Sequence, residues 1–62
     1  MPPFTNEEKR AAVVRELGYR KRVYERRVAD GKMTRQLADA QIAVFEAILA
    51  DYDELAEKER LL

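Results

Sequence analysis

The side chains that could do chemistry in this chain are carboxylates, guanidinium and ammonium groups and a few hydroxyls, because it contains no Cys, His or Trp. These absences remove disulfides, most transition-metal sites and His-based acid–base or nucleophilic catalysis. Two carboxylates could work as acid and base only in a cleft that perturbs them, and Thr5 and Thr34 stand where helices need caps. We therefore expect no catalytic residue and no enzymatic activity.

The acidic residues of the C-terminal half offer no convincing metal site. Asp39, Glu46 and Asp53 are seven residues apart, which is about 10 Å per step along a helix, so they cannot converge on one ion. Asp51 and Glu54 lie closer to Asp53 but lack the glycine turn and backbone carbonyls of a calcium loop. The sequence therefore predicts no metal and no cofactor, and a solvated acidic stripe.

The basic residues are the better candidates for binding. Residues 1–33 hold nine Lys or Arg against five acids, a net +4, whereas residues 34–62 hold three against seven, a net −4. Helical spacing places the candidate contact residues on one outward stripe: Arg15, Arg22 and Arg26, with Tyr19 at its edge. This stripe could contact the phosphates of a nucleic acid, with Tyr19 available to stack on a base, or it could contact a protein.

A structural explanation of the same arginines is also open. They could pair with Glu16, Asp30 or acids of the second half and only keep the protein soluble. The charges balance at 12 of each sign, and the isoelectric point near 6.2 is far below that of a typical nucleic-acid-binding domain.

The elements that position these groups are two helices. Thr5 and Glu8 form the pattern of a capping box, Gly31 can end a helix in the left-handed conformation, and Thr34 can cap the next. The sequence predicts a single domain over residues 1–62: a helix over about 6–30, a turn at 31–33 and a helix over about 35–58. Matched helices and a short connection predict an all-α antiparallel hairpin.

The second helix has two apolar seams at three- and four-residue steps. One seam is Leu37, Gln41, Val44, Ile48, Leu55 and Leu62, and the other is Ala38, Ile42, Phe45, Leu49, Tyr52 and Ala56. Together they form a face about 160° wide, which is too broad for one neighbouring helix. The residues expected in the core or in an oligomer contact are Leu17, Tyr24, Val28, Leu37, Ile42, Phe45, Ile48, Leu49 and Tyr52.

Size favours a second copy. In a chain of 62 residues without disulfides or metal, the free energy gained by burying apolar surface is nearly cancelled by the conformational entropy lost on folding. Sharing apolar surface between two hairpins would give a homodimeric four-helix bundle. No apolar run approaches the ~20 residues that span a bilayer, and residues 1–4 do not form a signal peptide, so we expect a cytoplasmic protein without membrane contact.

The segment Arg22–Thr34, with Ile42 and Glu46–Ile48, resembles a group of short phage- and prophage-encoded proteins. The shared features are an Arg-Val-Tyr-x-Arg stretch, a Gly-Lys/Arg-Met-Thr turn and an Ile-x3-Glu-Ala-Ile helix, which cover about residues 13–53. The resemblance implies a phage-related origin in a bacterial host and no chemistry. The architecture is also similar to Rop-type hairpins, which dimerise and bind paired RNA loops; no Rop residue is carried over.

Three functions follow as hypotheses. The first is a small interaction protein that self-associates and binds a protein partner in a host or phage process. The second is a nucleic-acid-binding regulator that uses the basic stripe. The third is a purely structural oligomerisation module.

Overall fold

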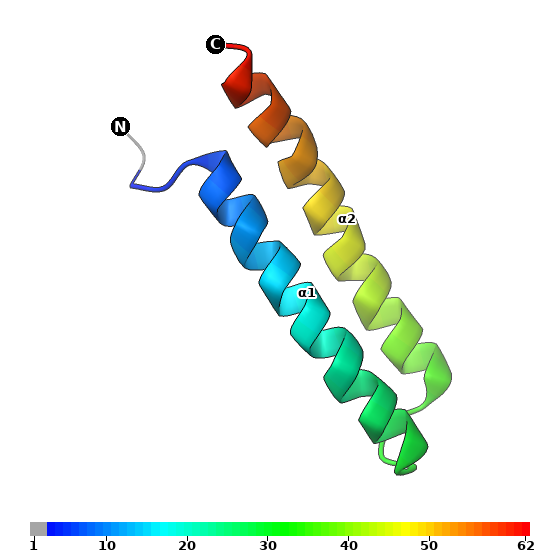
Figure 1. The fold of residues 1–62 in the computed structure, drawn as a ribbon. Coiled ribbons are helices and arrows are strands. Elements are labelled where there is room, and N and C mark those ends of the chain that lie inside the picture. The colour runs from blue at the N-terminus through cyan, green and yellow to red at the C-terminus, as the bar shows by residue number, and fades with distance from the viewer. Residues whose placement is uncertain (1–2) are drawn as a thin grey trace.

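A computed structural model describes residues 3–62. Met1 and Pro2 lie outside the described residues, and the expectation that residues 1–4 do not form a signal peptide falls partly on them. Within them the chain forms two helices, α1 (Asn6–Ala29) and α2 (Arg35–Arg60). The helices run side by side in opposite directions as an elongated hairpin, with the start of α1 and the end of α2 at one end and the turn at the other (Figure 1). The predicted all-α hairpin is confirmed.

Both ends of α1 form as the sequence predicts. The Thr5 hydroxyl accepts from the Glu8 backbone N–H at 3.0 Å, and the Glu8 carboxylate accepts from the Thr5 N–H at 3.1 Å, which completes the capping box. At the other end Gly31 has a φ of 71°, and the Lys32 N–H donates to the Arg27 carbonyl at 2.8 Å. This left-handed glycine turn satisfies carbonyls that the helix end leaves without partners.

Helix α2 begins after Thr34, whose hydroxyl accepts from the Leu37 N–H at 3.1 Å. The helix continues to Arg60, two residues beyond the predicted end. Lys58 and Arg60 lie in its last turn, where positive charge interacts favourably with the helix dipole.

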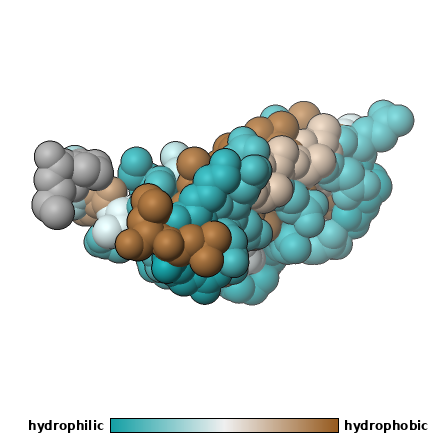
Figure 2. Space-filling model, turned by 90° about the horizontal axis from the view of Figure 1, so that it is seen from above, coloured by the Kyte–Doolittle hydropathy of each residue, from teal (hydrophilic) through white to brown (hydrophobic). Residues whose placement is uncertain are grey.

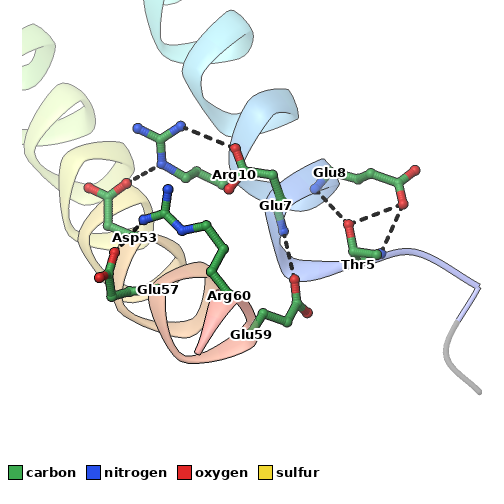
Figure 3. A network of polar contacts seen from close by, with 8 residues as sticks. All are labelled: Thr5, Glu7, Glu8, Arg10, Asp53, Glu57, Glu59 and Arg60. Atoms are coloured by element: carbon green, nitrogen blue, oxygen red, sulfur yellow. Dashed lines mark hydrogen bonds and ion pairs between the residues drawn. The ribbon is translucent and has the colours of Figure 1, made fainter. Parts of the chain in front are cut away.

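Glu59 links the end of α2 to the start of α1 (Figure 3). Its carboxylate accepts from the backbone N–H of Asn6 at 2.8 Å and from that of Glu7 at 3.3 Å. Thr5 satisfies the next two amides, through its hydroxyl to Glu8 and its carbonyl to Lys9. The first four N–H groups of α1 therefore all have acceptors. Two of these acceptors are the carboxylate oxygens of Glu59, at the far end of the chain.

The core of the hairpin is thin. Among the described residues only Leu17, Ala38 and Ala56 are buried. Six of the residues expected in the core are half-buried between or beside the helices: Tyr24, Val28, Ile42, Phe45, Leu49 and Tyr52. Ile48 is also half-buried, whereas Leu37 is 50% exposed. Leu37 therefore does not belong to the core of the single hairpin, because it lies on the flank of α2 and not on the side that meets α1.

The shape leaves much surface exposed. The radius of gyration is 14.4 Å, against about 10.6 Å for a globular domain of this length. The accessible surface is 4952 Å², against about 4100 Å² for a compact monomer of this mass. The hairpin thus exposes roughly 800 Å² more than a compact monomer would.

Candidate interaction site

One flank of α2 carries an apolar stripe, which is the first seam of the sequence: Leu37, Gln41, Val44, Ile48, Leu55 and Leu62. Ala38 and Ala56 face α1, and at about 100° per residue Leu37, Val44 and Leu55 lie roughly 100° to 120° around the helix from them. Val44 is 54% exposed and Leu55 41%. Seen from above, patches of hydrophobic surface lie between hydrophilic surface (Figure 2).

The opposite flank of the helix pair is polar. Arg10 pairs with Asp53 near the open end, and Arg35 pairs with Glu25 near the turn through two contacts of 2.6 and 2.9 Å (Figure 3 shows the first pair). The hydrogen bond and charge of Asp53 raise the pKa of Arg10. We call this flank the polar edge.

The acidic stripe is exposed to solvent, as the sequence predicts, and its carboxylates also form ion pairs. Asp53 binds α1, Asp39 lies 3.5 Å from Arg35, and Glu57 pairs with Arg60. The sequence places these acids on one face but does not reveal that Arg10 reaches them from the other helix.

Arg20 joins the two helices on the apolar side. Its guanidinium lies 4.5 Å from the centre of the Phe45 ring and donates to the Tyr24 hydroxyl at 2.8 Å. Its Nε is shielded from solvent and lies 2.9 Å from the Glu16 carboxylate without the alignment of a hydrogen bond. The Tyr24 hydrogen bond, and more weakly Glu16, raise the pKa of Arg20. The charge pattern of the sequence suggested the Glu16 contact but not the stacking on Phe45.

The candidate contact residues separate into two places. A shallow depression of about 450 Å³ beside the turn is lined by Tyr19, Arg22, Val23, Arg26, Arg27, Asp30 and Lys32. We call it the basic depression. It brings together Tyr19, Arg22 and Arg26, whereas Arg15 lies outside it on the exposed surface of α1.

The arginines of the candidate site have no acidic partner within the part of the chain that the structure describes. No carboxylate of residues 3–62 lies within ion-pair distance of Arg15, Arg22 or Arg26. Glu16 contacts Arg20 instead. Pairing with Glu16 or Asp30 therefore does not account for these three guanidinium groups, and they are available to a ligand.

Neither described helix combines the length and apolar character needed to cross a bilayer. Comparison with protein-family models, with curated proteins and with solved structures found no match. The apolar stripe and the basic depression are the two surfaces on which a partner could bind.

Proposed function

We propose that this chain is a small non-enzymatic interaction protein that self-associates through the apolar stripe and binds a protein partner through the basic depression. The observation that carries the proposal is the combination of a thin core, with three buried residues among 3–62, and a row of exposed apolar side chains on one flank of α2. Burying such a row against a second copy removes apolar surface from water, which stabilises the complex by about 25 cal/mol for each Å² buried. The proposed assembly is a homodimeric four-helix bundle in the bacterial cytoplasm, in line with the phage resemblance.

Self-association is tested by sedimentation velocity over a concentration series. We expect a mass of about twice 7.2 kDa at high concentration. Val44→Glu should shift the equilibrium to monomer, because a carboxylate would be buried in the interface without a partner. Ala43→Glu is the matched control: Ala43 is also exposed on α2, but on the side away from the stripe, and the variant should remain dimeric. A wild-type chain that stays monomeric at every concentration would contradict the proposal.

The partner surface is proposed to be acidic. Arg22 and Arg26 lie beside Tyr19 in the depression, without an ion-pair partner among residues 3–62, and guanidinium groups match carboxylates of a protein through paired hydrogen bonds. Asp30 in the same depression and the net −4 of residues 34–62 make a long phosphate polymer a poorer match. A charge-reversed chain carrying Arg15→Glu, Arg22→Glu and Arg26→Glu should keep its circular dichroism spectrum and lose binding to a partner captured by the wild type.

The same unpaired guanidinium groups support nucleic-acid binding as a second candidate function. Gel shifts at low salt with duplex, single-stranded and hairpin nucleic acids separate the two. Binding that weakens steeply with added salt and disappears in the charge-reversed chain would replace the protein partner by a nucleic acid. A dimer that binds neither class would be a structural oligomerisation module.

A further inference from the structure

We infer that the occupant of the apolar stripe is a second copy of this chain that runs antiparallel along α2, with the two-fold axis beside residue 46. This inference rests on the proposed self-association and deepens it, because it fixes direction and register. It follows from the polar residues that interrupt the stripe spacing.

Eight residues, seven in α2 and the last just beyond its end, follow alternating steps of four and three, the repeat by which one helix packs along another. They are Leu37, Gln41, Val44, Ile48, Asp51, Leu55, Lys58 and Leu62. Asp51 and Lys58 are exposed in the single hairpin, and Lys58 lies 3.5 Å from Glu54 on the same helix. Any helix that packs along the stripe must therefore accommodate a carboxylate at one level and an ammonium group at another.

A parallel pairing in register is disfavoured by charge. It would place each of these residues against its own copy, so Asp51 would face Asp51 and Lys58 would face Lys58. Like charges opposed at a partly desolvated contact repel each other.

An antiparallel pairing about residue 46 matches the chemistry at the three levels where residues of this spacing meet in both copies, and Lys58 falls level with Thr34 of the second copy. Leu37 meets Leu55 of the second copy and Val44 meets Ile48, so apolar residues face apolar residues. Gln41 meets Asp51, where the side-chain amide can donate to the carboxylate. The two polar residues in the middle of the stripe thereby become partners of each other, and each pair occurs twice because the axis is two-fold.

The surface shape agrees with this register. A hollow of about 320 Å³ is lined by Asp51, Glu54, Leu55 and Lys58. In the antiparallel register it lies opposite Leu37 of the second copy, a side chain that is 50% exposed in the single hairpin.

The same axis also passes beside helix α1. Glu25 lies about 80° around α1 to one side of Leu17, on the polar edge, whereas Glu16 and Arg20 lie about 60° to 100° to the other side, on the flank of the stripe. The contacts of Arg20 with Phe45 and of Arg10 with Asp53 place residue 46 of α2 level with about residue 18 of α1. An axis at that level brings Glu16 opposite Arg20 of the second copy, an attractive pairing, and Lys9 opposite Arg27, a repulsive one.

Thiol crosslinking tests the direction, since the chain has no native Cys. In the antiparallel register, residues 37 of the two copies are about 27 Å apart along the axis, while residue 37 faces residue 55. We expect a mixture of Leu37→Cys and Leu55→Cys chains, distinguished by a tag on one of them, to form mainly the mixed disulfide. Ala43→Cys, on the side away from the stripe, is the control and should not crosslink in the dimer.

The outcomes separate the two proposals. A disulfide between two Leu37→Cys chains as the main product would overturn the antiparallel register and leave self-association standing. Chains that remain monomeric would overturn both.

A charge pair at residue 41 gives a second test that does not depend on cysteines. Gln41→Lys should tighten the dimer on the order of tenfold because the ammonium group would face Asp51 of the second copy twice, and Gln41→Glu should weaken it by a similar factor. In a parallel dimer both variants would face themselves and weaken it. Weakening by both variants would therefore overturn the register.

Discussion

Glu59 gives the hairpin its closure at the level of a single residue. A carboxylate in the last turn of a helix is unfavourable to that helix, because the C-terminal end of the helix dipole is negative. In this hairpin the same carboxylate lies at the N-terminus of α1 and accepts from two of its free amides. These two contacts link the open end of the hairpin.

We therefore predict that Glu59→Ala lowers the free energy of unfolding by about 1–2 kcal/mol, the usual loss when a charged cap is removed. Urea denaturation followed by circular dichroism at one fixed concentration measures this difference. Glu46→Ala is the matched control, because Glu46 is exposed and has no ion pair among residues 3–62; its effect should stay within about 0.5 kcal/mol. Equal effects of the two substitutions would show that Glu59 does not cap α1.

The two glycines have opposite roles. A Cβ at Gly18 would lie 3.8 Å from the Arg22 guanidinium, an ordinary contact, so nothing in the single hairpin requires a glycine there. We predict that Gly18→Ala raises the free energy of unfolding by about 0.5–1 kcal/mol. Gly31→Ala should lower it by about 1–2 kcal/mol because the φ of 71° disfavours a side chain. A destabilising Gly18→Ala, in the same urea experiment, would indicate that another backbone approaches this position.

At the scale of the elements, the sequence allowed the helices to be predicted but not the contacts between them. The capping residues Thr5, Gly31 and Thr34 act locally, so their types and spacing were sufficient to place three of the four helix ends within about a residue. The partners of Arg10 and Glu59 are more than 40 residues away in sequence, and no periodicity within one helix reveals them. The basic depression was only partly predictable, because Arg15 shares the outward stripe of α1 but not the depression beside the turn.

The pairing of Glu25 with Arg35 predicts a pH dependence of the helix contact near the turn. The hydrogen bonds and charge of Arg35 lower the pKa of Glu25 below its ordinary value of 4.5. A lowered pKa in the folded state means that the stabilisation is complete above about pH 4.5 and is lost as the pH falls through the folded-state value.

We expect the thermal midpoint of the wild type to fall between pH 6 and pH 3 by more than that of Glu25→Gln. The pair is exposed, so 0.5 M NaCl should reduce the difference between the two chains. Thermal melts at both salt concentrations measure it. Parallel pH profiles of wild type and variant at low salt would show that the pair does not contribute.

At the scale of the whole molecule, stability and assembly depend on each other. The thin core and the surplus surface mean that a hairpin gains most of its further burial from its partner. Mass action then makes the apparent stability depend on protein concentration.

We predict that the thermal midpoint rises by several degrees for each tenfold increase in concentration. Circular dichroism melts between about 1 and 100 µM measure this rise. Val44→Glu should remove the concentration dependence, whereas Ala43→Glu should keep it. A wild-type midpoint independent of concentration over this range would contradict a shared core.

The difference between the two flanks of the hairpin also limits how far assembly can proceed. Ion pairs already occupy the polar edge, so the apolar stripe is the surface through which each copy associates. A contact in which each copy uses the same surface is self-complementary, and it leaves no free apolar stripe to which a third copy could bind. Growth of the assembly would therefore stop at two chains, and hairpins with an exposed apolar stripe would not polymerise into fibres.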